Sequence, residues 1–468
     1  MLTDYLPGKG GSGPKNWLKK KRPQGAAEGH DPILPMSFVF RTWWPLAASW
    51  ILMAFELPAV SAIVARLPFP ETNLAAWGGV VFPTSMIIEA PIIMLLAAST
   101  ALSKDWESYK RLRRYMMIMG ASLTLLHFLI SFTPLFDLLV IGMIHPPAEV
   151  VEPARIGLRL MLPWTWSIAY RRFNQGVLIR FGHAEVVGWG TFSRLTADCL
   201  ILALGYWLGM IPGIVVAGLA VSCGVLSEAL YAGLRVRSVL DNQVRQTASA
   251  PDRVTFGTFL DYYFPLVMTS LLTLLIQPLG SAALSRMPEA LASLAAWPVL
   301  SGLVFLLRSL GVAFNEVVVA LLDRPKSYAS LKRFALYLAF LTTSFLVLVA
   351  CTPLSKAWFV SVSALKPKLA SIAAAALWFA LPLPGLNAAQ SLFQGILLHL
   401  HQTRSITVSV VAFLLVAGAV LWIGVLNGKV IGLNVGWLAF SLGASAQTAL
   451  LWWFSRKARR RLREGENA

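Results

Sequence analysis

The chain repeats itself over about 220 residues, and this repeat limits the available folds more than any other feature. Five short motifs of the first half return in the same order in the second half. The offset is 265 − 45 = 220 residues for the first two motifs and 353 − 134 = 219 for the others. The matched residues are Pro45 with Pro265, Trp77 with Trp297, Pro134 with Pro353, Pro163 with Pro382, and Gln175 with Gln394. Two long, apolar, homologous halves are typical of transporters whose binding site lies between the repeats.

Composition places the chain in a membrane. Of its 468 residues, 57% are hydrophobic and 13% are charged, whereas soluble domains carry roughly 25% charged residues. The net charge of +18 does not indicate a nucleic-acid partner, because Lys and Arg cluster at the ends of apolar runs and no zinc spacing, Walker loop or RNA-binding signature occurs. The cysteines Cys199, Cys223 and Cys351 lie in or beside apolar runs and are interpreted as packed side chains. No metal site and no cofactor is predicted.

Six apolar stretches in each half are long enough to cross a bilayer, which takes about 20 residues. In the first half they lie near 40–66, 74–102, 115–142, 154–180, 186–208 and 211–236. In the second half they lie near 259–285, 290–322, 332–351, 369–399, 405–426 and 431–455. Five domains are predicted: a disordered basic cytoplasmic tail (1–38), a six-helix lobe (39–240), a cytoplasmic linker (241–258), a second six-helix lobe (259–456) and a basic cytoplasmic tail (457–468).

The distribution of Lys and Arg gives the orientation. Basic residues collect in both tails and in alternate connections, around Lys110, Arg237 and Lys326, while the opposite connections carry few apart from the loop with Lys366 and Lys368. The positive-inside rule therefore puts both termini in the cytoplasm, in a multi-pass protein of the cell membrane. Because each half has an even number of spans, the repeats are parallel and related by an axis along the membrane normal. The predicted fold class is an all-α membrane protein of two six-helix lobes.

The fourth span of each half carries the most recognisable motif. Residues 173–178 read Phe-Asn-Gln-Gly-Val-Leu, and their repeat at 393–397 reads Phe-Gln-Gly-Ile-Leu. Glycines at 432 and 436 give the twelfth span a spaced pattern. With two parallel six-helix repeats, the chain resembles the multidrug/oligosaccharidyl-lipid/polysaccharide exporter superfamily. The resemblance implies the two-lobe bundle of multidrug and toxic compound extrusion proteins and a transport function, not an enzyme.

Several motifs are similar to the progressive ankylosis branch of that superfamily, which moves small anions outward. They are Trp44-Pro45-Leu46, Glu56, Val187-Gly188 with Ser193, and Ser285-Arg286. The first-span Asp of the drug-efflux branch is absent, since 59–61 read Ala-Val-Ser. The resemblance implies a monomeric secondary-active exporter of a small organic or phosphate-bearing anion, coupled to protons or sodium and surrounded by lipid. Cation-coupled multidrug efflux and flipping of a lipid-linked sugar remain alternatives.

Polar residues at mid-span are candidates for the substrate site, because exposure of a charge to hydrocarbon costs about 3 kcal/mol or more. Arg172 and Gln175 share one helix face, and the equivalent span of the second half offers amides at spacings of three and four. Guanidinium groups bind carboxylate or phosphate in a bidentate manner. The predicted substrate-binding residues are Arg172, Gln175, Arg308, Asn387, Gln390 and Gln394. Of Arg171 and Arg172, only Arg172 is expected to face the cavity.

Three acidic residues are candidates for gating or coupling. Glu89 and Arg308 are repeat-equivalent (308 − 89 = 219), and in the resembled superfamily their spans face each other, so they are predicted to form an interlobe gate or a static ion pair. Glu228 is equivalent to Gln447 (447 − 228 = 219) and would serve as a proton carrier or in an interhelical hydrogen bond. Glu56, in the first span, is the third candidate.

Four other polar groups have simpler interpretations. Arg194 is expected to pair with Asp198, four residues on. His127 is expected to be a packed histidine with satisfied hydrogen bonds, and Glu316 to reach the cytoplasmic interface.

Overall fold

The computed structural model describes residues 34–248, 254–324, 326–400 and 402–467. Most of the predicted tail at 1–38 and part of the predicted linker at 241–258 lie outside these residues. Across the first half, the helices are α2 (Met36–Ala54), α3 (Glu56–Val64), α4 (Pro70–Ala75), η1 (Ala76–Val81), α5 (Phe82–Ile93), α6 (Leu95–Leu102), α7 (Trp106–Phe132), η2 (Asp137–Ile144), α8 (Ala148–Leu160), α9 (Leu162–Arg180), α10 (Glu185–Leu208), α11 (Gly213–Val239) and η3 (Leu240–Val244).

The second half repeats this order with fewer interruptions. Its helices are α12 (Phe256–Leu284), α13 (Ala290–Leu321), α14 (Ser327–Cys351), α15 (Leu354–Lys356), η4 (Ala357–Val362), α16 (Pro367–Ala380), α17 (Leu383–His399), α18 (Thr403–Asn427) and α19 (Gly432–Asn467). The π-helical segments η2 and η4 occupy equivalent places, each after the third column of its half.

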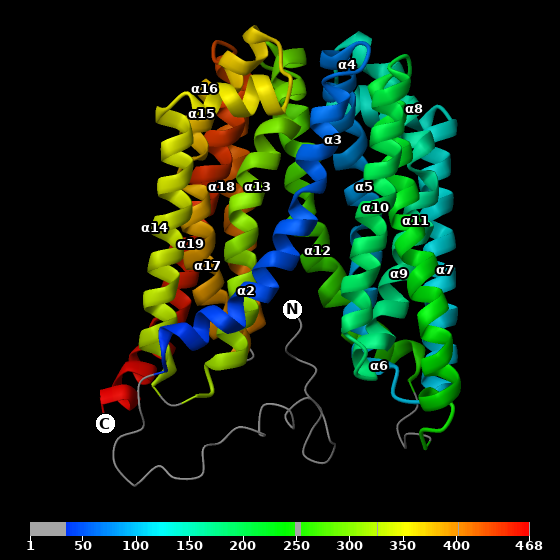
Figure 1. Cartoon of the computed structure of the whole chain (residues 1–468), viewed down its shortest axis with the longest axis vertical. Helices are drawn as coiled ribbons and strands as arrows, with labels where there is room; N and C mark the ends of the chain where they lie inside the picture. Colours follow the sequence, from blue (N-terminus) through cyan, green and yellow to red (C-terminus); the bar gives the residue numbers. More distant parts are fainter. Residues whose placement is uncertain (1–33, 249–253, 325, 401, 468) are drawn as a thin grey trace.

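The predicted all-α fold of two six-helix lobes is confirmed. Within the described ranges the helices form twelve columns: α2–α3, α4–α6, α7, α8–α9, α10, α11, α12, α13, α14, α16–α17, α18 and α19. Nine of these columns are long and apolar enough to cross a membrane by length and composition. The other three, α8–α9, α10 and α19, carry polar or charged side chains along their length. Figure 1 shows the two lobes side by side, with the columns running between an upper and a lower end.

Prolines explain where several columns break. A proline lacks the amide donor and clashes with the carbonyl four residues earlier. Helix α2 accordingly ends at Ala54, four residues before Pro58, and α16 ends at Ala380, four residues before Pro384. The break between α8 and α9 falls just before Pro163. Both predicted ends of the third span were wrong, because α7 begins at Trp106 rather than 115 and ends at Phe132 rather than 142. Helix α19 continues into the predicted basic tail.

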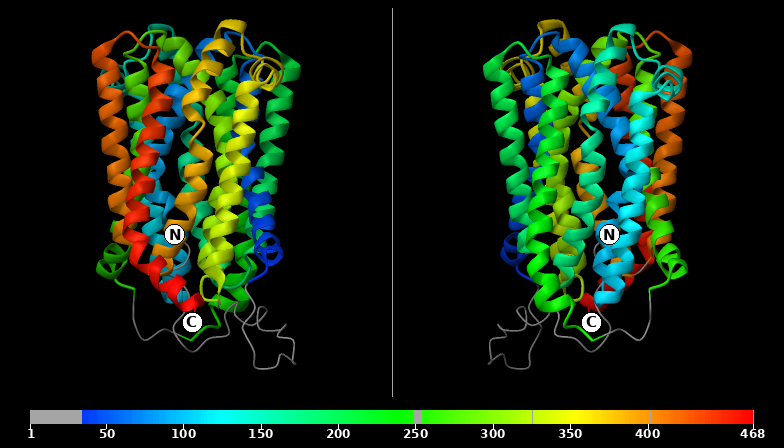
Figure 2. Two further views of the ribbon diagram at one scale, coloured as in Figure 1. Left: turned by 90° about the vertical axis from the view of Figure 1, so that its left-hand side faces the viewer. Right: turned by 90° about the vertical axis from the view of Figure 1, so that its right-hand side faces the viewer.

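The extension of α19 has a local cause. Its last turns are rich in Ala, Arg, Lys and Leu, which favour helix. Arg460 also donates to Glu464 one turn later, with Nε and Oε1 at 2.9 Å. Figures 1 and 2 place the end of α19 and the start of α2 at the same lower end of the molecule.

The first column of each half crosses toward the opposite lobe (Figure 1). Helix α2 packs on α13 of the second lobe, and α12 packs on α5 of the first. Trp43 Nε1 donates to the carbonyl of Leu310 at 3.0 Å. Tyr263, its repeat partner (263 − 43 = 220), donates its hydroxyl to the carbonyl of Pro91, which is equivalent to Leu310 (310 − 91 = 219). These matched bonds are the signature of parallel repeats related by a twofold axis along the columns.

At the upper end the lobes close on each other through a second matched pair of contacts. Arg66 Nη1 donates to Val362 O at 2.9 Å and Nη2 to Ser361 O at 2.8 Å. Arg286, its repeat partner (286 − 66 = 220), donates from Nη1 to Ile144 O at 3.1 Å. Each arginine therefore binds carbonyls at the end of a π-helical segment in the opposite lobe. We call Arg66 and Arg286 the upper clamp.

The backbones of the two lobes also approach each other closely near the axis. A Cβ on Gly78 of η1 would lie 2.5 Å from Cγ of Pro298 on α13, its repeat equivalent (298 − 78 = 220). No side chain fits there, so glycine is required. Lys366 and Glu71 add an ion pair at 3.2 Å across the same end. At the lower end the lobes are joined mainly by α2 and α12.

The outer surface carries large apolar side chains. On α7, α10, α14 and α18 these include Leu125, Trp207, Phe340 and Leu415, all exposed. Exposed apolar area of this extent marks a surface that meets lipid.

Candidate functional site

A cavity of about 360 Å³ lies between the two lobes. Its walls come from α2, α3, η1, α5, α9, α10 and α11 on one side and from α12, α13 and α19 on the other. The polar lining residues are Glu56, Glu89, Arg171, Arg172, Arg194, Gln277, Ser301 and Arg308. The aromatic lining residues are Trp50, Trp77, Phe82, Trp164, Trp297, Phe305, Trp437 and Phe440. The cavity is thus mainly apolar, with a few convergent polar groups, as small-molecule sites are.

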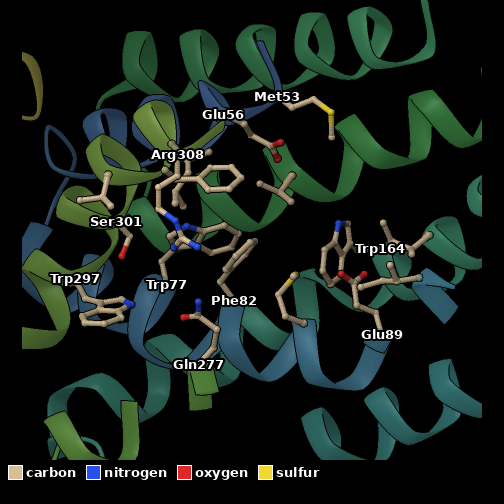
Figure 3. Close-up of a pocket in the computed structure, with 18 of the residues that line it drawn as sticks. Met53, Glu56, Trp77, Phe82, Glu89, Trp164, Gln277, Trp297, Ser301 and Arg308 are labelled. Carbon is tan, nitrogen blue, oxygen red and sulfur yellow. The ribbon is translucent and has the colours of Figure 1, made fainter. Parts of the chain in front are cut away.

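One face of α13 forms most of the second-lobe wall. The lining residues of this helix are Trp297, Ser301, Val304, Phe305 and Arg308, at intervals of three and four residues that place them on one helical stripe. Figure 3 shows Trp297, Ser301 and Arg308 on one side of the cavity, with Glu89 and Trp164 on the other. The spacing in the sequence therefore aligns a guanidinium with aromatic rings along one wall.

Arg171 is neutralised inside the first lobe. It donates from Nη1 to Oε2 of Glu228 on α11, and the two residues are 3% and 1% exposed. Gln175, one turn later on α9, donates from Nε2 to Oε1 of the same carboxylate at 2.8 Å. Glu228 therefore accepts hydrogen bonds on both oxygens and lies behind the cavity wall, not in the lining.

Arg194 is also paired. Its Nη2 donates to both carboxylate oxygens of Glu56, with Oε1 at 2.6 Å, while Nε lies 3.8 Å from Asp198 Oδ2. The predicted ion pair of Arg194 with Asp198 is therefore present, and the structure adds Glu56 as a second and nearer partner. Helix α3 packs on α10 and brings in a carboxylate 138 positions away, which spacing along one helix cannot reveal.

Three charged groups of the lining have no such partner. Of the residues that the structure describes, none places an oppositely charged atom within 4.0 Å of Arg172, Arg308 or Glu89. Glu89 is 3% exposed, and its Oε2 accepts no hydrogen bond from the described residues. Arg308 is the charged residue that the second lobe contributes to the lining. It faces the cavity without a compensating carboxylate.

The structure brings together four of the nine predicted site residues. Arg172, Arg308, Glu56 and Glu89 all line the cavity. Glu89 and Arg308 lie on opposite sides of it (Figure 3) and form no ion pair in this conformation. Their gating role and the coupling role of Glu56 stay predictions.

Five predicted site residues lie outside the lining. Gln175 and Glu228 bond to each other behind the first-lobe wall. In the second lobe, Gln390 Nε2 donates to Ala444 O at 3.1 Å and to Thr448 Oγ1 at 3.0 Å, inside the lobe. Asn387 and Gln394 share the helix of Gln390 and also lie outside the lining. Helical spacing does not indicate that Gln390 meets α19 or that Asn387 lies against Gly311 of α13.

The expectation that only one of Arg171 and Arg172 faces the cavity was wrong, since both contribute to the lining. Arginine side chains are long, so two that leave a helix about 100° apart still reach the same space.

The aromatic residues of the lining were not predicted as site residues, and Arg194 was predicted only as the partner of Asp198. Trp77 and Trp297 were identified only as markers of the repeat. The spacing of residues in the eighth span could have indicated these aromatic residues, because Trp297 lies on the same face of α13 as Arg308. An aromatic ring in line with a mid-membrane arginine points to a binding wall more directly than either residue alone.

The remaining predictions concern the polar residues His127 and Glu316. His127 is a packed histidine as expected, with Nδ1 at 2.7 Å from Thr165 Oγ1 and Nε2 at 3.0 Å from Leu158 O. The reach of Glu316 to the cytoplasmic interface stays a prediction; in the structure Glu316 accepts a hydrogen bond from Trp50 Nε1 of the crossing helix α2 at 3.2 Å. Trp50 itself lines the cavity.

No cluster of His, Cys, Asp and Glu with the composition of a metal site occurs in the described part of the chain.

Comparison with known proteins gives a fold. No protein-family model matches the chain, and no curated protein matches it significantly. An inward-facing multidrug resistance MATE family transporter of the MOP superfamily aligns at TM-score 0.69 and 15% identity, over 90% of this chain and 99% of that one. The outward-facing conformation of a MATE transporter aligns at TM-score 0.60 and 17% identity, over 92% and 97%.

A third structure with this fold differs in its pocket. It is a MOP superfamily transporter from Pyrococcus furiosus, described as having a reversed polarity of its binding pocket that suggests a different function, and it aligns at TM-score 0.59 and 17% identity, over 92% and 97%. At these identities the matches show the fold of MATE transporters, a multi-pass membrane bundle. They do not distinguish the progressive ankylosis branch that the sequence resembles.

Proposed function

We propose that the chain is a secondary-active transporter that exports a small organic or phosphate-bearing anion by alternating access at the interlobe cavity. Its fold is that of solved transporters, and the cavity lies between the lobes. The proposed orientation puts the lower end, where α2 begins and α19 ends, in the cytoplasm. In this orientation the upper clamp closes the outer side.

The observation that carries the proposal is the isolated guanidinium of Arg308. A buried charge without a partner is destabilising in a membrane protein, and Arg308 has no anionic partner among the described residues. An anionic substrate would compensate this charge at the moment of binding. Arg172, which is also unpaired, offers a second cationic group from the first lobe.

The first lobe supports coupling to a cation. Its buried cluster contains one carboxylate more than it has arginines: Glu56, Glu89, Asp198 and Glu228 against Arg171, Arg172 and Arg194. A proton or a sodium ion would balance the excess charge. Glu89 is the carboxylate of this set that has no ion pair and lines the cavity. We therefore propose Glu89 as the group through which substrate and cation influence each other.

Transport in liposomes tests the proposal. The purified protein is reconstituted, and uptake of radiolabelled benzoate, citrate and pyrophosphate is measured beside that of the cationic dye ethidium, with and without a pH or sodium gradient. We expect transport of at least one anion, its loss in Arg308→Gln, and no change in the matched control Arg404→Gln, which alters an exposed arginine far from the cavity. The Glu89→Gln variant is expected to transport without gradient dependence.

Multidrug efflux remains the second candidate, because the aromatic lining and the fold of multidrug MATE transporters both suit it. Pocket polarity is not fixed by this fold, as the description of the Pyrococcus furiosus protein indicates. Transport of ethidium together with failure to transport all three anions would favour this alternative over the proposal.

A further inference from the structure

We infer that the transported anion is amphipathic, with one acidic head group and a flat apolar body. The inference rests on the proposed function, since it names the substrate class of the same cavity. It excludes compact anions with several charges, such as citrate and pyrophosphate, as the main substrates.

The head group binds at Arg308. Ser301 lies two turns earlier on the same face of α13, and Gln277 of α12 lines the same cavity (Figure 3). Together they offer a guanidinium, a hydroxyl and an amide. One guanidinium binds two oxygens of a single carboxylate, sulfonate or phosphate. The several charges of citrate or pyrophosphate exceed what the two unpaired guanidinium groups of the lining, Arg172 and Arg308, can compensate beside the carboxylate of Glu89, and a buried charge without a partner is costly.

The lining also contains hydrogen-bond donors that lack an acceptor. The indole Nε1 groups of Trp77, Trp164 and Trp437 are buried, and none has a hydrogen-bond partner in the described residues. The same is true of Nε of Arg172 and Arg308. Indole and guanidinium nitrogens donate only, and an unsatisfied buried donor is destabilising. These buried nitrogens do not reach a ligand directly, but the surplus of donors around the cavity disfavours an ammonium ligand, which would bring further donors.

The body of the substrate lies against aromatic rings. Trp297 stacks on Trp437 with ring centroids 5.0 Å apart, and Phe440 meets Trp297 edge-on at 5.2 Å. Trp77 and Phe82 form a second pair, at 5.8 Å, in the first-lobe wall. Aromatic walls bind flat apolar groups through area and ring geometry. The cavity volume of about 360 Å³ is near the lower limit of pockets that bind drug-sized ligands. An acid with one or two aromatic rings is therefore of a suitable size and shape.

Calorimetric binding to the purified full chain separates this inference from the proposed function. The probes are 1-naphthoate, the neutral 1-naphthylmethanol, the cationic 1-naphthylmethylammonium, citrate and pyrophosphate. We expect naphthoate to bind most tightly. Arg308→Gln should weaken naphthoate by about 10- to 100-fold, the value of charge-assisted hydrogen bonds, and leave the neutral alcohol unchanged. Trp437→Leu should weaken both ring compounds, and Arg404→Gln neither.

Each outcome decides the matter. If citrate or pyrophosphate binds and naphthoate does not, the substrate class is wrong while the proposed anion transport stands. If the ammonium compound binds more tightly than every anion, the proposed function itself fails. Absence of naphthoate binding, or equal naphthoate affinity in the parent and in Arg308→Gln, overturns the inference. Arg308→Lys, which keeps the charge but not the planar fork, covers the case in which the glutamine variant does not fold, and it should bind naphthoate less tightly than the parent.

Discussion

Replacing both arginines of the upper clamp by glutamine is expected to move the protein toward a conformation that is open at the upper end. Arg66 makes two hydrogen bonds across the interface, to Val362 O and Ser361 O, and Arg286 makes one, to Ile144 O. The lobes meet through these bonds only when the upper end is closed. Removing them destabilises the closed state and leaves the open state unaffected.

The size of the shift follows from the number of bonds. A net contribution of about 0.5–1 kcal/mol per hydrogen bond suits donors that are partly in water. Three bonds then favour closure by about 1.5–3 kcal/mol, a factor of roughly 10 to 150 in the ratio of closed to open states. Arg66→Gln alone removes two bonds, so it should produce about twice the free-energy change of Arg286→Gln alone.

Pulsed electron–electron resonance between spin labels measures this ratio. Labels are attached at the exposed residues Glu149, in the first turn of α8, and Lys429, in the connection between α18 and α19, after the three native cysteines have been replaced. The double variant should show a larger long-distance population than the parent protein, in detergent and in lipid.

Arg155→Gln is the matched control, because Arg155 lies at the same end but binds Asp137 within its own lobe, at 2.6 Å. Unchanged distances in the double variant would refute the reasoning. An equal shift in the control would refute it too, since the effect would then come from loss of charge and not from interlobe bonds.

Three further results are expected. Neutralising either member of the buried pair Arg171 and Glu228 should lower the free energy of unfolding by about 3–5 kcal/mol, and replacing both by apolar residues should lower it less. Thermal unfolding measures this, and a double variant whose loss of stability equals the sum of the two single losses would contradict it. Gly78→Ala should open the upper end in the same spin-label assay, while Gly418→Ala, where an added Cβ meets no atom within 4 Å, should not; equal behaviour of the two would contradict the packing argument. A cysteine at Glu149 should react with an impermeant reagent from outside intact cells, and reaction only after permeabilisation would reverse the proposed orientation.

The sequence alone determined the membrane class, the repeat and the parallel arrangement of the lobes. These properties depend on the order and composition of residues along the chain, not on which helices pack together. A bilayer demands a fixed length of apolar chain, and an even number of spans fixes the relative orientation of the halves. The same reasoning identified the mid-membrane charges, because any charge inside a long apolar run stands out.

Only the tertiary structure decided which of these charges are paired. Arg171 and Gln175 both bind Glu228, and Arg194 binds Glu56, across separations of 53 to 138 residues. Arg308, which looked no different in the sequence, faces the cavity without a partner. Helical periodicity states which residues share a face, but the neighbour that covers the face depends on how helices distant in sequence pack together. For that reason, the unpaired guanidinium and its aromatic surroundings become visible only in three dimensions.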